Sequence, residues 1–181
     1  MLMVLMLNGW TTNVAKTKNL RMMNKIIFGV EKIDKCSGTA YALGYGGAVP
    51  FVVFVAMQWH GYQLIQGGVS LIYFYGSIIL SFLGAPHWGY ILAMTDKAEI
   101  NKLAGRLVIG VIPSLIAFFS ILFDELDRLL IIGSSFIFMY VIDSILFRQE
   151  NIPTWFLPLR FRLTVIVASC FFCSIVLLIV R

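Results

Sequence analysis

The run YGSIILSFLGAPHWGYIL, Tyr75–Leu92, decides how this chain folds. It has no Asp, Glu, Lys or Arg in 18 residues, a length that crosses most of the roughly 30 Å hydrocarbon core of a bilayer as a helix. The run is also rich in small residues and contains the sequence Pro86-His87-Trp88. Small residues let a second helix approach closely, and an ionisable side chain inside a span marks a site of packing or function.

The composition extends this reading to the whole chain. Of 181 residues, 60% are hydrophobic and only 13% are charged, whereas a soluble domain is about 45–50% apolar and about 25% charged. We therefore predict an all-α, polytopic membrane protein, because backbone polar groups in lipid must be satisfied within helices. Five segments are expected to span the membrane: Ser37–Trp59, Val69–Met94, Leu103–Phe123, Leu129–Phe147 and Leu163–Val180. Pro50, Pro86 and Pro113 lie inside three of them and are expected to bend their helices.

The basic residues predict the orientation. Of the 14 basic residues, six precede the first segment. Three flank the loop between the second and third segments, and three flank the loop between the fourth and fifth segments. Basic residues gather on the inner side of a membrane, so the N-terminus is expected inside, in the matrix or cytoplasm, and the C-terminus outside. The same rule accounts for the net charge of +5 without a nucleic-acid partner.

The chain divides into a basic amphipathic N-terminal arm, residues 1–36, and a five-helix transmembrane domain, residues 37–181. Residues 1–30 contain four basic and no acidic side chains, which is typical of a mitochondrial presequence. We therefore predict the mitochondrial inner membrane, with the bacterial cytoplasmic membrane as the alternative. The arm is either an uncleaved targeting signal or a surface helix.

Several ionisable residues are predicted to meet near the inner leaflet. The second and fourth segments both run inward, so His87 and Asp143 are expected at similar depth, close to Arg106, Arg160 and Arg162. A buried Asp is costly unless it finds a cation or a donor. The favoured interpretation is a structural polar clamp; the alternative is a proton-handling or ligand site.

A second set of residues predicts close helix packing. Small side chains recur through the second segment above His87, and we expect them to form a packing seam: Gly76, Ser77, Ser81 and Gly84.

No motif predicts catalysis or an intrinsic cofactor. His60 and His87 are expected near opposite faces of the membrane and so do not share a metal. Cys170 and Cys173 lie on one face of the last segment, a spacing that favours packing over redox chemistry. We therefore predict no catalytic residue, metal or intrinsic cofactor; bound phospholipid is the one ligand class expected, because a basic inner surface suits lipid head groups.

Three stretches resemble a known family. They are YGSIILSFLGAPHWG at residues 75–89, RLVIGVIPSLIAF at 106–118 and PTWFLPLRFRLT at 153–164. In order and spacing they are similar to the transmembrane protein 69-like family, and the resemblance runs from Gly38 to Thr164. It implies a five-helix inner-membrane protein of bacteria or mitochondria and implies no reaction. The family pattern tolerates other pairs where this chain has Ala85 and Pro86, so a proline there is not a general feature.

These observations lead to one prediction of function and two alternatives. We predict a non-catalytic accessory subunit of a larger inner-membrane complex, above all of the mitochondrial respiratory chain, whose partners are other membrane subunits and phospholipids and not nucleic acid. The first alternative is a small proton-linked transporter that uses His87 and Asp143. The second is an assembly factor that binds its complex transiently.

Overall fold

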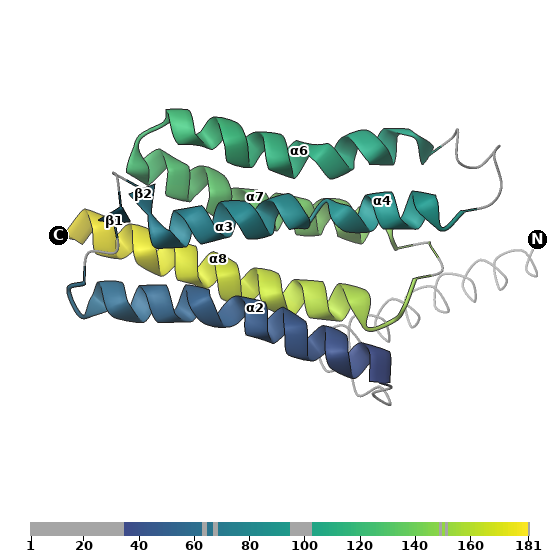
Figure 1. Ribbon diagram of the computed structural model, residues 1–181, viewed down its shortest axis with the longest axis horizontal. Coiled ribbons are helices and arrows are strands. Elements are labelled where there is room, and N and C mark those ends of the chain that lie inside the picture. The colour runs from purple at the N-terminus through teal and green to yellow at the C-terminus, as the bar shows by residue number, and fades with distance from the viewer. Residues whose placement is uncertain are drawn as a thin grey trace, which may run out of the picture.

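The computed structural model describes residues 35–62, 65–66, 69–94, 103–148, 150 and 152–180. The predicted N-terminal arm lies almost wholly outside these residues. Within them the chain forms a bundle of long helices joined by short connections (Figure 1). The helices are α2 (Lys35–Trp59), α3 (Leu71–Phe82), α4 (Ala85–Leu92), α6 (Gly105–Phe119), the 3-10 helix η1 (Ser120–Leu122), α7 (Glu125–Leu146) and α8 (Phe156–Val180).

Five membrane spans are formed by these helices, as the sequence predicts. Each is long and apolar enough to cross a bilayer; they are Lys35–Trp59, Leu71–Leu92, Gly105–Leu122, Glu125–Leu146 and Phe156–Val180. Large apolar side chains are exposed along all of them, which suits a surface solvated by lipid. A small antiparallel pair, β1 (Ile65–Gln66) and β2 (Val69–Ser70), lies between the first two spans, with Ile65 opposite Ser70.

The second span differs from the single bent helix expected over Val69–Met94. It consists of α3 and α4, which lie almost end to end and are separated at Leu83 and Gly84 (Figure 1). Pro86 lies in the first turn of α4, where its missing N–H costs no helical hydrogen bond. The helix therefore breaks just before the proline. By contrast, α2 and α6 continue through Pro50 and Pro113.

Two helices begin earlier than hydropathy predicts. α7 starts at Glu125, four residues before the expected Leu129, because Glu125 and Asp127 in its first turn suit the positive end of the helix dipole. α8 starts at Phe156 and not at Leu163. Its first turn accepts Pro158, so the arginines expected before the fifth span lie on the helix itself.

The core is aromatic. Phe51 of α2, Phe136 of α7 and Phe171 of α8 meet with ring centroids 5.9–6.1 Å apart. Tyr75 of α3 packs on Phe51 at 4.9 Å and donates a hydrogen bond to the carbonyl oxygen of Gly47, at 2.9 Å. One cluster thus joins four of the five spans.

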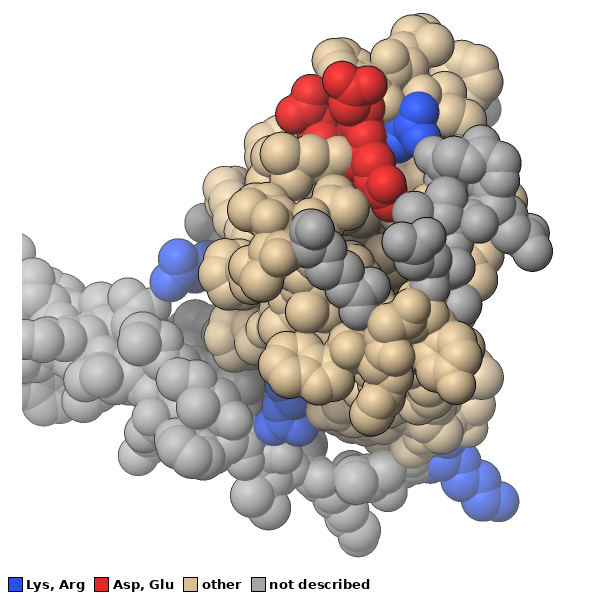
Figure 2. Space-filling view, turned by 90° about the vertical axis from the view of Figure 1, so that its left-hand side faces the viewer, with Lys and Arg blue, Asp and Glu red and all other residues tan. Residues whose placement is uncertain are grey.

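The two ends of the bundle differ in charge. We call the end where α2, α6 and α8 begin the basic end. Its described basic residues are Lys35, Arg106, Arg148, Arg160 and Arg162. The opposite, acidic end carries Asp124, Glu125 and Asp127 at the connection between α6 and α7; Figure 2 shows acidic side chains gathered on this face. The asymmetry accords with the positive-inside argument, and the orientation stays a prediction.

Candidate functional site

Asp143 lies at the centre of a buried polar cluster at the basic end. Its side chain is fully buried on α7. Arg160 of α8 donates through Nε to Asp143 Oδ2 at 2.8 Å, and its Nη2 donates to the same oxygen. His87 of α4 places Nε2 at 3.1 Å from the other oxygen, Oδ1. One carboxylate therefore connects three helices.

His87 is held by packing more than by hydrogen bonds. It is fully buried, and its ring stacks on Phe147 with centroids 5.0 Å apart and planes 19° apart. The approach of Nε2 to Asp143 is within ion-pair distance but is not aligned as a hydrogen bond, and Nδ1 has no hydrogen-bond partner among the described residues. His87 lies in the first turn of α4, directly after the break, and its N–H donates to the Gly84 carbonyl.

Arg106 forms a second pair that the sequence reasoning missed. It was expected beside Asp143, but its Nη2 donates to Glu150 Oε1 at 2.6 Å and to the Leu146 carbonyl at 2.7 Å. Tyr90 donates its hydroxyl to the other oxygen of Glu150, and the Arg106 guanidinium lies 4.8 Å from the centre of the Tyr90 ring. The available signal was that Glu150 is the one acidic residue between Asp143 and the C-terminus.

Phe147 connects the two pairs. Besides stacking on His87, its ring lies 5.4 Å from the Arg106 guanidinium and 5.7 Å from the Tyr90 ring. An aromatic face beside a cation is favourable, by about 0.5–2 kcal/mol depending on desolvation. Together the residues form what we call the polar clamp: His87, Asp143, Arg160, Arg106, Glu150, Tyr90 and Phe147.

Arg162 is placed apart from the polar clamp. Two residues beyond Arg160, it lies about 200° around α8. It is half-buried and forms no ion pair with any acidic side chain that the structure describes. The structure thus brings His87, Asp143 and Arg160 together, gives Arg106 a different acidic partner, and leaves Arg162 on another face.

The predicted packing seam contains two kinds of contact. A Cβ on Gly84 would lie 1.8 Å from the carbonyl oxygen of Gly110, so α6 passes against the backbone here. A Cβ on Gly76 would lie 2.5 Å from the ring of Phe171. Ser77 and Ser81 instead donate to backbone carbonyls one turn earlier in α3, each at 2.9 Å. Only the glycines permit the close approach.

The described residues offer no obvious metal centre. Among them, no three His, Cys, Asp or Glu side chains lie close enough together to hold a metal ion. His60 is exposed at the acidic end, far along the bundle from His87. Cys36, Cys170 and Cys173 are free thiols.

The fold and the clamp define a polytopic membrane protein with five spans, in which largely buried arginines pair with the acidic side chains Asp143 and Glu150. Residues 36–176 match the model of a protein family of unknown function, DUF3429, and the chain belongs to that family. It is 27% identical over 144 residues to transmembrane protein 69 of Xenopus tropicalis, across 77% of this chain and 54% of the relative. The resemblance seen in the three sequence motifs is thereby confirmed.

The chain spans about half the length of that curated relative. No solved structure gives a significant match.

Proposed function

We propose that the chain is a non-catalytic accessory subunit of a larger inner-membrane complex, and specifically of the mitochondrial respiratory chain. One observation carries the proposal: α2 has a second packing face that nothing in the described bundle covers. Its residues are spaced alternately four and three apart and all are exposed: Ala42, Gly46, Val49, Val53 and Ala56. We call them the outer face of α2.

Each of the two faces of α2 carries a glycine. On the inner face, a Cβ on Gly44 would lie 2.9 Å from Leu163 of α8, so that glycine permits a close helix contact. On the outer face, a Cβ on Gly46 would meet nothing within 4 Å. Small residues along a helix face favour association with another helix, because lipid chains solvate Leu as well as protein does. The outer face therefore suits a helix of a partner subunit.

The polar clamp supports a structural role. Asp143 accepts hydrogen bonds from Arg160 and lies beside His87. Glu150 accepts hydrogen bonds from Arg106 and Tyr90. Both acidic groups are therefore engaged in joining helices. The mitochondrial part of the proposal is supported by residues 1–30 of the basic arm, which contain four basic and no acidic side chains. The accessory role is supported by the lack of a catalytic motif in the sequence.

Mild-detergent extraction from the native membrane, native electrophoresis and mass spectrometry of the co-migrating band test the proposal. We expect stable, stoichiometric co-migration with respiratory-chain subunits. Migration of the chain alone, or of a homo-oligomer, contradicts the proposal. Association only with immature complexes identifies a transient assembly factor instead.

A proton-linked carrier is the second candidate, and His87 favours it. Its imidazole is fully buried beside the Asp143 carboxylate and its Nδ1 has no hydrogen-bond partner among the described residues, and ionisable side chains buried within spans are typical of proton relays in transporters. Proteoliposomes of the isolated protein with an internal pH-sensitive dye separate the candidates. The accessory role predicts no flux. A flux that His87→Ala and Asp143→Asn abolish, with both variants folded, establishes the carrier.

A further inference from the structure

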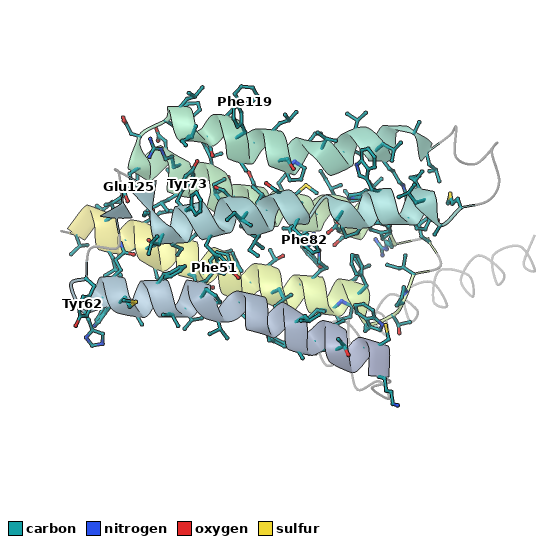
Figure 3. The ribbon with its side chains drawn as sticks, viewed as in Figure 1. Phe51, Tyr62, Tyr73, Phe82, Phe119 and Glu125 are labelled. Carbon is teal, nitrogen blue, oxygen red and sulfur yellow. The ribbon has the colours of Figure 1, made fainter. Side chains whose placement is uncertain are left out.

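A cavity of about 320 Å³ lies between α2, α8 and the α3–α4 pair, next to the polar clamp. Leu43 and Phe82, which are 72% and 73% exposed, flank its mouth on the membrane surface, whereas Phe51 and Phe136 lie at its buried end. Figure 3 shows Phe51 and Phe82 both in the space between α2 and α3. The cavity thus runs from the lipid-facing surface into the core.

The size and lining of the cavity point to a ligand. Protein interiors leave few voids larger than a water molecule, and ligand pockets begin at about 300 Å³. Between Leu43 at the mouth and Phe51 at the buried end, α2 presents only small residues to the cavity, namely Ala40, Gly44, Gly47 and Ala48, and these leave the space open. Since nearly all of its wall is apolar, water gains few partners inside. A hydrocarbon chain from the surrounding membrane is the occupant that the chemistry of the wall selects.

One end of the cavity is polar. Among the described residues that line it, Arg160 is the one charged side chain; it is 11% exposed and is fixed by Asp143. An arginine held in place by a carboxylate is oriented before any ligand arrives, and guanidinium binds phosphate in bidentate geometry.

The surrounding charge favours an anion. At the basic end the described residues include five basic side chains, namely Lys35, Arg106, Arg148, Arg160 and Arg162, against two acidic ones, Asp143 and Glu150. Basic pockets between helices on the inner side of a membrane suit anionic head groups.

We propose that this cavity binds one acyl chain of an anionic phospholipid, with the lipid phosphate at Arg160 and the chain extending towards Phe51. Asp143 is then a positioning residue for Arg160, and the polar clamp connects lipid binding to the α4, α7 and α8 contact. The proposal is independent of the accessory-subunit role, because it concerns the isolated chain.

Filling the cavity tests the proposal. Gly47 lines it, and a Cβ there would meet only the Tyr75 hydroxyl, at 4.0 Å, so Gly47→Leu puts a side chain into open space. Gly46→Leu is the matched control, because Gly46 is the adjacent glycine, does not line the cavity, and a Cβ there would meet nothing within 4 Å. Ala40 also lines the cavity, two turns before Gly47 on α2. Ala40→Leu is used in place of Gly47→Leu if that variant does not fold.

Purified wild type and variants are delipidated and then offered phosphatidylglycerol or phosphatidylcholine with identical acyl chains, and retained lipid is counted by native mass spectrometry. We expect wild type and Gly46→Leu to retain phosphatidylglycerol at least tenfold more than phosphatidylcholine, and a folded Gly47→Leu to lose that retention at least tenfold. Equal retention of both lipids by wild type, or undiminished retention by both cavity-filling variants, overturns the proposal.

Discussion

The two ends of the bundle join their helices by different chemistry. At the basic end, Asp143 and Glu150 bind arginines across helices. Towards the acidic end, the described bonds between side chains of different helices are neutral: Tyr73 bonds Ser120 at 2.9 Å, and the Ser174 hydroxyl donates to the Gln58 side chain at 2.7 Å. Neutral bonds between membrane helices contribute about 0.6 kcal/mol on average, whereas breaking a buried ion pair costs about 3–5 kcal/mol. The basic end should therefore tolerate single substitutions far less well.

Asp143→Ala should have the largest effect on stability. It leaves the Arg160 guanidinium without its carboxylate in a buried site, so we expect a loss of about 3–5 kcal/mol in the free energy of unfolding. Reversible denaturation in mixed detergent micelles measures it. Asp143→Leu combined with Arg160→Met removes both charges. This double variant should lower the free energy of unfolding clearly less than Asp143→Ala does. A single variant within 1 kcal/mol of wild type would show that the ion pair is not a strong inter-helix link.

Gly84→Ala should have the next largest effect, because the obstacle is backbone. The added Cβ would lie 1.8 Å from the Gly110 carbonyl oxygen, so α4 and α6 must separate. We expect a cost near the upper end of the roughly 1–3 kcal/mol typical of overpacking. Gly89→Ala is the matched control; a Cβ there meets nothing within 4 Å, and stability should hold or rise by about 0.5–1 kcal/mol. Equal effects of the two changes would refute the close approach.

Gly76→Ala tests how closely α3 packs against the aromatic core. The new methyl would meet the Phe171 ring at 2.5 Å, an obstacle that a side-chain movement can partly relieve, so the expected cost is about 1–2 kcal/mol. Phe171→Leu combined with Gly76→Ala should then cost less than the sum of the two single changes, as a double-mutant cycle measures. Simple additivity would mean that Gly76 and Phe171 are not coupled.

Tyr73→Phe should have the smallest effect. It removes the hydrogen bond to Ser120 and leaves the ring in place, so a loss of about 0.6 kcal/mol is expected. The Ser120 hydroxyl keeps an acceptor in the Ala117 carbonyl, at 2.8 Å. The same denaturation assay measures this change. If Tyr73→Phe lowered the free energy of unfolding as much as Asp143→Ala, the inter-helix bonds at the two ends would not differ in strength.

The same contrast shows how much the sequence could predict. The number of spans follows from length and hydropathy alone, and it is correct. The starts of α7 and α8 were set too late, since hydropathy excludes the charged first turns that a helix tolerates at a membrane surface. His87, Asp143 and Arg160 were expected at one depth, and the structure brings their side chains into contact.

The pairing of Arg106 with Glu150 could not be read from the sequence. Depth gives a position along the membrane normal, but not how far each helix is rotated about its axis, and rotation decides which arginine meets which acid. Arg162 shows the same limit. It was expected at the depth of Asp143, but it lies on a different face of α8 from Arg160. The close approach of Gly84 to the Gly110 carbonyl is likewise a contact between distant segments, which hydropathy does not show.

The accessory-subunit proposal depends most directly on the outer face of α2, and one pair of variants tests it. Gly46→Leu and Gly89→Leu each place a leucine on an exposed helical glycine with open space around it. Native electrophoresis after mild-detergent extraction measures how much of each variant migrates with the large complex. The account predicts at least a tenfold loss for Gly46→Leu, with Gly89→Leu like wild type. Undiminished co-migration of Gly46→Leu would contradict it.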